Sequence, residues 1–135
     1  MAKEDKTRVV DRAYADIRLN DARAFLQQAE ISLQLVEGPR RDATVVSSAV
    51  LAGIAASDAV CAMVLGMVSV GAHTQAVRLL SRVSGSVKAV NDLSRLTAIK
   101  TAAQYTGTSM SERQTADAVA RARRLLEFAE SQRRR

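Results

Sequence analysis

The most restrictive feature of this sequence is a long stretch that carries almost no charge. Residues 43 to 72 contain one charged side chain, Asp58, among residues that are otherwise apolar, small or hydroxylated. The apolar positions recur at spacings of three and four, which predicts a helix from about Asp42 to Val70. A helix that is apolar on every side must be surrounded on most sides. The stretch therefore predicts a central helix of a helical bundle, a dimer interface, or both.

Three stripes run along this predicted helix. The stripe that contains the charge consists of Leu51, Ile54, Asp58, Cys61, Leu65 and Val68. A second stripe holds only small residues, which would let another helix approach closely: Ala55, Ala59, Ala62 and Gly66. The third is mostly apolar: Val46, Val50, Gly53, Ser57, Val60, Val64 and Met67.

The rest of the chain is also predicted to be helical, because no segment shows sustained alternation of apolar and polar residues. A first helical region from about Asp5 to Glu37 is one bent helix, or two if Asn20 or Asp21 caps a second start. Its later buried face is predicted as Ala22, Phe25, Ala29, Leu33 and Val36. A third and a fourth helix are predicted over about 74–83 and 87–105.

A capping box predicts the start of a fifth helix, either Ser109 with Glu112 or Ser111 with Gln114. Its expected buried face consists of Thr115, Ala118, Val119, Ala122, Leu125, Leu126 and Ala129. We therefore predict an all-α, up-down bundle of four to five helices in a single domain, residues 1–135. Its core spans about 8–130, and residues 131–135 form a frayed basic tail.

Composition excludes several classes of function. One cysteine and one histidine rule out an internal disulfide and the multi-Cys or multi-His metal sites, and no cofactor motif is present. Aromatic residues make up 3% of the chain, which argues against recognition by stacked bases or sugars. No secretory pattern occurs in residues 1–10, and Asp58 interrupts the apolar stretch. We expect a cytoplasmic protein that does not enter a membrane.

Positive charge is concentrated in the second half of the sequence. The chain has a net charge of +6, and residues 73–105 carry five basic side chains and one acid. Such a balance permits binding to RNA or another polyanion. The candidate anion-binding residues are Arg78, Arg82, Lys88, Arg95, Arg121 and Arg124, which serve equally well as a solvated face.

Two residues of opposite charge interrupt apolar stripes, Asp58 on the second helix and Lys100 on the fourth. A buried carboxylate needs a partner, so we predict that Asp58 contacts Lys100, or else Arg95 or Tyr105. Such a pair either fixes the helix register or belongs to a catalytic site. His73 is an exposed turn residue or an acid–base group, because imidazole titrates near neutral pH. Cys61 is expected to be an inert core residue.

The helix order resembles the HEPN superfamily, in particular its small actinobacterial members. The resemblance covers about residues 20–130 and is carried by Ala-Ala-Ser-Asp-Ala (55–59), by Leu93, Leu96 and Lys100, by Ala-Gln-Tyr (103–105) and by the closing helix 117–129. It implies a helical bundle that dimerises, with ribonucleases of toxin–antitoxin or defence systems among its members. Those enzymes use an Arg and a His that are separated by four to six residues. Here the positions before His73 that would hold the Arg are Gly66, Met67 and Val68, so the standard site is absent.

Three functions follow as hypotheses. The first is a dimeric HEPN-like binding or regulatory module in an RNA-linked, toxin–antitoxin or defence-type system, paired through the apolar second helix. Its protein partner would be of the antitoxin or nucleotidyltransferase type. The second is a metal-independent ribonuclease toxin with a non-standard site drawn from Asp58, Lys100, Tyr105 and His73. The third is a structural protein whose second helix docks a foreign helix.

Overall fold

The computed structural model describes residues 6–104, 106, 107 and 109–135, with only the backbone of Gln104. It confirms the all-α class, because five helices dominate and the two described strands are three residues long. The elements in chain order are β1 (Thr7–Val9), α1 (Arg12–Leu35), α2 (Arg41–Leu65), β2 (Met67–Ser69), α3 (His73–Leu80), α4 (Val87–Gln104) and α5 (Glu112–Arg133).

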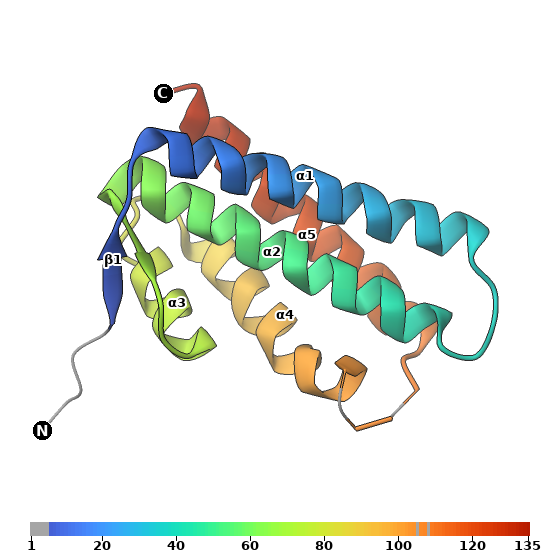
Figure 1. Cartoon of the computed structure of the whole chain (residues 1–135). Helices are drawn as coiled ribbons and strands as arrows, with labels where there is room; N and C mark the ends of the chain where they lie inside the picture. The colour runs from blue at the N-terminus through green and yellow to red at the C-terminus, as the bar shows by residue number, and fades with distance from the viewer. Residues whose placement is uncertain (1–5, 105, 108) are drawn as a thin grey trace, which may run out of the picture.

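The central helix of the bundle is α2, as its composition predicted. Figure 1 shows α1 antiparallel to α2, with α5 packed behind both and α4 crossing below α2, while α3 is a short helix beside α4. The small-residue stripe of α2 is buried: Ala55 and Ala59 are inaccessible and Ala62 is 5% exposed. The stripe that contains Asp58 is less covered, because Leu51 is 38% exposed and Ile54 is half-buried.

Close packing around α2 depends on Gly53. A Cβ atom at this position would lie 2.5 Å from Leu96 Cδ1 of α4 and 3.2 Å from Leu125 Cδ1 of α5. Real Cβ contacts are essentially never as short as the first of these distances. The missing side chain therefore sets how closely α4 and α5 approach α2.

The apolar composition of α2 also passes a length-and-hydropathy test for a membrane span, with a mean hydropathy of 1.9. Inside the bundle, 61% of the tested window is buried. The core helix of a soluble protein passes the same test, so this result is weak evidence for membrane insertion.

The sequence prediction was wrong about the strands. β1 and β2 form an antiparallel pair with Thr7 opposite Ser69 and Val9 opposite Met67. The predicted second helix stops early because Gly66 adopts a left-handed conformation, with φ of 68°, and closes α2. The first helix begins at Arg12, because the Asp11 carboxylate accepts a hydrogen bond from the Tyr14 amide at 2.9 Å.

The same helix is a single element, so neither Asn20 nor Asp21 caps a second start. Two further expectations about helix ends were wrong. Val36 lies outside α1 in extended conformation and is 43% exposed, so it does not join the core. The predicted frayed tail is helical as far as Arg133, whose Nε lies 3.0 Å from Asp16 Oδ1 of α1.

One of the two predicted capping boxes of the last helix is present, and the buried face of this helix was predicted correctly. Ser111 and Gln114 form the capping box, with both reciprocal hydrogen bonds present at 3.0 and 2.9 Å. The buried residues of α5 are Thr115, Ala118, Val119, Ala122, Leu125, Leu126 and Ala129, as the spacing predicted.

Candidate anion-binding site

The surface built by α3 and α4 has an unusual charge balance. Between Asp58 and Glu112 the sequence contains one acidic residue, Asp92, which is 3% exposed. The same stretch contributes six basic or titratable side chains: His73, Arg78, Arg82, Lys88, Arg95 and Lys100. Four of these are exposed, and His73 and Lys100 are half-buried. This segment therefore presents cations to solvent without an exposed carboxylate of its own.

One neighbour outside the segment limits this positive face. Glu127 of α5 lines a hollow together with Lys88 and Asp92 at the N-terminal end of α4. The other exposed cations of the segment are Arg78 of α3, Arg82 in the turn that follows α3, and Arg95 of α4.

His73 and Lys100 meet on this face. His73 is the first residue of α3, and Lys100 lies in the penultimate turn of α4. Lys100 Nζ is 2.9 Å from His73 Nε2, and because a lysine ammonium only donates, the imidazole nitrogen accepts. The proton of the neutral ring then resides on Nδ1. Burial, and then the charge of Lys100, lowers the pKa of His73 from its usual value of 6.5.

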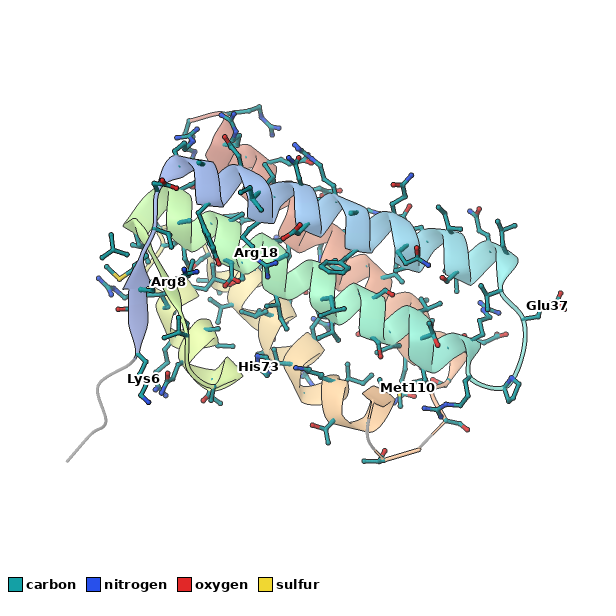
Figure 2. All side chains as sticks on the ribbon, viewed as in Figure 1. Lys6, Arg8, Arg18, Glu37, His73 and Met110 are labelled. Carbon is teal, nitrogen blue, oxygen red and sulfur yellow. The ribbon has the colours of Figure 1, made fainter. Side chains whose placement is uncertain are left out.

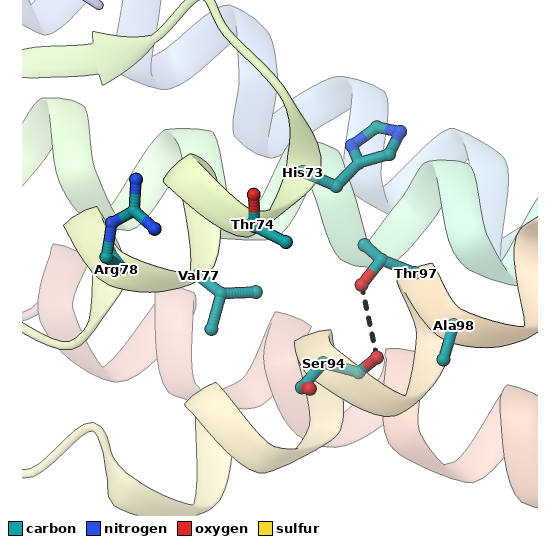
Figure 3. Close-up of a pocket in the computed structure, with 7 residues that line it drawn as sticks. All are labelled: His73, Thr74, Val77, Arg78, Ser94, Thr97 and Ala98. Atoms are coloured by element: carbon teal, nitrogen blue, oxygen red, sulfur yellow. Dashed lines mark hydrogen bonds between the residues drawn. The ribbon is translucent and has the colours of Figure 1, made fainter. Parts of the chain in front are cut away.

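A pocket of about 450 Å³ opens between α3 and α4 next to this pair. Figure 3 shows Arg78 at one end of the pocket and His73 at the other, with Thr74 and Val77 between them. Ser94, Thr97 and Ala98 line the side formed by α4. The Thr97 hydroxyl donates to the Ser94 carbonyl at 3.1 Å. Arg78 at one end, and Lys100 bound to His73 at the other, place positive charge near the hydroxyl groups of the pocket, which suits an oxyanion such as a phosphate.

The partner predicted for Asp58 was wrong. Arg18 of α1 donates to Asp58 Oδ2 from Nε at 3.3 Å and from Nη2 at 3.2 Å. A third bond joins Arg18 Nη1 to Asp21 at 2.9 Å, and Figure 2 shows Arg18 between α1 and α2. The Asp58 stripe of α2 therefore faces α1, while Lys100 bonds to His73.

Of the two remaining partners predicted for Asp58, Arg95 is not among the described residues bound to it. Arg95 lies exposed on α4. Tyr105 lies outside the described residues. The ion pair of Asp58 therefore joins α1 to α2 and involves no residue of α4.

Desolvation dominates the electrostatics of Asp58. Its side chain is 18% exposed, and burial raises its pKa above the usual 3.8 even though Arg18 acts in the opposite direction. Arg18, which has a second acidic partner in Asp21, keeps a raised pKa. The contacts of Asp58 thus favour the structural role, in which the pair fixes how α1 lies against α2.

A buried cluster around Asp92 was missed by the sequence analysis. Arg124 donates to both carboxylate oxygens, from Nε at 3.0 Å and from Nη2 at 2.8 Å, and Arg121 donates from Nη1 at 2.9 Å. Two of the six candidate anion-binding residues are therefore bound to an internal carboxylate. One signal was present in the sequence, because Asp92 lies three residues after Ala89 and four before Leu96 on the buried face of α4.

Cys61 and the potential metal ligands add no second site. The Cys61 thiol is buried, and burial, followed by the charge of Asp58, raises its pKa to about 12. A thiol in this state is a poor nucleophile, which agrees with the predicted core role. Across the described part of the chain, no three His, Cys, Asp or Glu side chains come together in an arrangement that could hold a metal ion.

Comparison of the chain with models of protein families, with curated protein sequences and with solved structures returns no match. The resemblance to the HEPN superfamily therefore stays a prediction. The fold and the site together describe a small basic helical-bundle protein with a candidate anion-binding face on α3 and α4.

Proposed function

We propose that this chain is a HEPN-like RNA-binding module that holds the phosphate backbone on the face formed by α3 and α4. The observation that carries the proposal is the absence of exposed acidic residues between residues 59 and 111, where Arg78, Arg82, Lys88 and Arg95 are exposed. Contacts of this kind neutralise phosphates and release counterions. Because the chain has only four aromatic residues, the backbone rather than the bases supplies most of the binding energy.

The biological setting of the proposal rests on the resemblance. A HEPN-like module without the Arg–His ribonuclease pair would act as a binding or regulatory member of a toxin–antitoxin or defence-type system. Its protein partner would then be of the antitoxin or nucleotidyltransferase type. A helical bundle with a basic face is compatible with this role, and fold alone does not assign it.

Salt-dependent RNA binding tests the proposal. A fluorescently labelled single-stranded RNA is titrated with the wild type and with the double variant Arg82→Gln/Arg95→Gln at several salt concentrations. Each phosphate contact contributes about 0.7 to the slope of log K against log salt for single strands. We expect the slope of the double variant to fall by about 1.4, with weaker binding at low salt.

The matched control removes two arginines from other parts of the surface, Arg12 and Arg113, which are also exposed. Arg12→Gln/Arg113→Gln has the same net charge as the test variant. An equal loss of binding in both double variants would show a general charge effect and refute an α3–α4 site. A wild type that does not bind RNA at low salt would refute RNA binding altogether.

A second candidate function, metal-independent RNA cleavage, is favoured by the contact between His73 and Lys100. Among the candidate catalytic residues that the structure describes, these two bond to each other. The Nε2 lone pair of His73 is occupied by Lys100, so the ring would act as a base only after Lys100 moved to an RNA phosphate. Cleavage in the presence of EDTA by the wild type, lost in both Lys100→Met and His73→Gln, would support this candidate. Circular dichroism checks that the variants are folded.

A further inference from the structure

Helix α1 carries two stripes with the same heptad spacing on opposite sides. The inner stripe packs in the core and consists of Ala15, Leu19, Ala22, Leu26, Ala29 and Leu33. The outer stripe, which we call the outer seam, lies two positions further along at each step: Ile17, Asp21, Ala24, Gln28, Ile31 and Leu35. Alternating steps of four and three keep one face of a helix toward a partner helix. A shift of two residues turns the face by about 200°, so the outer seam points away from the core.

The outer seam is both apolar and exposed. Ile17 is 59% exposed, Ile31 43% and Leu35 75%, which makes α1 the described helix with the most exposed large hydrophobic residues. Apart from Glu30, whose side chain is 41% exposed and paired with Arg123, the exposed side chains between residues 24 and 36 are uncharged: Ala24, Gln27, Gln28, Ile31, Gln34, Leu35 and Val36. A contiguous uncharged surface of this kind marks an interaction site.

The charged residues beside the seam already have partners within the chain. Three of them form ion pairs with α5: Asp16 with Arg133 at 3.0 Å, Arg23 with Glu130 at 3.2 Å and Glu30 with Arg123 at 3.0 Å. Asp21, the one charged residue in the seam itself, is bound to Arg18 at 2.9 Å. A partner packed on the seam would therefore leave the three ion pairs with α5 at a polar rim, and Asp21 would enter the interface already bound to Arg18.

We propose that the outer seam of α1 is the interface with a second copy of this chain, packed antiparallel. The glutamine amides both donate and accept hydrogen bonds, so the seam is complementary to itself. A chain of net charge +6 repels another copy of itself, whereas the outer seam contains one charged residue, the acidic Asp21, and no basic residue. A two-fold axis then places the same patch on both copies.

The antiparallel direction follows from the position of Asp21. A parallel pair would place the two Asp21 carboxylates in the same layer, where like charges repel. In the antiparallel pair Ile17 lies opposite Leu35, Asp21 opposite Ile31, and Ala24 opposite Gln28. The opposed helix dipoles also favour this direction.

The size of the seam sets the strength of the dimer. α1 has 24 residues, so it is about 36 Å long and, with side chains, about 10–12 Å wide. Its projected face is on the order of 400 Å², about half of the 800 Å² per partner in a typical stable interface. We therefore expect a dimer that forms at micromolar or higher concentration. Dimerisation through α2 remains the competing prediction, and Leu51, 38% exposed, tests it.

Sedimentation velocity over a wide concentration range distinguishes the two interfaces. We expect the wild type to associate as concentration rises, and Ile31→Glu to stay monomeric. The matched control is Val87→Glu, which places the same charge at an 83% exposed valine of α4 and is expected to associate like the wild type. If Leu51→Glu abolishes association and Ile31→Glu does not, or if the wild type is monomeric at every concentration, the proposal is wrong.

Disulfide cross-linking tests the direction. Ile17→Cys and Leu35→Cys are oxidised separately and as a mixture, with the buried Cys61 left in place. The two positions are about 27 Å apart along one helix, so the antiparallel pair cross-links only in the mixture. Cross-linking of each variant with itself would show a parallel pair and overturn the antiparallel assignment. RNA binding plays no part in either measurement.

Discussion

Lys100 Nζ lies 2.9 Å from His73 Nε2, so the single imidazole of this chain accepts a hydrogen bond from an ammonium group. Protonation of the ring would remove the accepting lone pair and place two positive charges side by side. An anion bound next to the pair would offset that repulsion. The protonation of His73 is therefore a direct reporter of what occupies this face.

We expect the pKa of His73 to be below 6.5, and Lys100→Met to raise it partway toward that value, because burial is the larger cause of the shift. NMR titration of the one histidine ring measures both values. Saturating RNA should raise the pKa of the wild type, since phosphate stabilises the imidazolium. A pKa that is unchanged in Lys100→Met would contradict the hydrogen bond, and Arg12→Gln serves as a control for net charge.

The pair of Asp58 and Arg18 predicts an unusual dependence of stability on pH. The pKa of Asp58 is raised in the folded state, so the folded chain binds its proton more readily than the unfolded chain. Its ionisation lowers stability as pH rises through the folded-state pKa, and stability returns as pH falls toward 3.8. Asp58→Asn does not titrate at this position. Urea unfolding of both proteins is compared at neutral pH and at successively lower pH. We expect the unfolding free energy of the wild type to rise relative to that of Asp58→Asn as the pH falls. A relative decrease would contradict the prediction.

Asp92 should be the most sensitive acidic residue of the described chain. Its carboxylate is 3% exposed and accepts from two arginines, so Asp92→Asn leaves those cations with a weaker partner. Because Arg124 is 51% exposed and Arg121 retains Asp117, the expected loss is about 1–3 kcal/mol, below that of a fully buried pair. Asp117→Asn, at an exposed position, is the control and should change the unfolding free energy by less than about 0.5 kcal/mol. Equal changes in the unfolding free energy for the two substitutions would show that the buried Asp92 contributes no more to stability than the exposed Asp117.

Gly53→Ala should destabilise the bundle although alanine favours helices. The new methyl group would meet Leu96 of α4, and overpacking of this kind costs about 1–3 kcal/mol. Ser48→Ala lies at a half-buried position of the same helix. It raises the helix propensity and adds no atom that could clash, so it should be neutral or stabilising. Thermal unfolding of the two variants beside the wild type decides the matter. A raised melting temperature in Gly53→Ala would mean that Leu96 moves aside easily.

The features that could be predicted from the sequence are those set by neighbouring residues. The capping box at Ser111 and Gln114 and the buried face of α5 depend on short spacings, and both are confirmed. The partner of Asp58 depends on how α1 is rotated against α2, which periodicity along α2 does not determine. The burial of Asp92 likewise depends on where Arg121 and Arg124 of α5 come to lie.

The strands were missed for a related reason. Three residues are too few to show alternation, and each strand exists only because the other one, far away in the chain, supplies its hydrogen bonds. The end of α2 was placed too late because the apolar periodicity continues past Gly66 into β2. For the site, both His73 and Lys100 are recognisable as candidates in the sequence, but their contact is not, because it depends on how α3 packs beside α4 and on no short-range pattern.

The pairing of β1 with β2 has a consequence for the order in which the molecule assembles. Thr7 lies opposite Ser69, so β1 has no partner until the ribosome has released the whole α1–α2 hairpin and the turn at Gly66. β1 therefore pairs with β2 only after α1 and α2 have brought the two strands together and shortened the loop to be closed. All three β1 residues are exposed, so few contacts hold the strand once it has docked. A spectroscopic label at Thr7 would therefore follow the final step of folding in the forward direction and the first step of local opening in reverse.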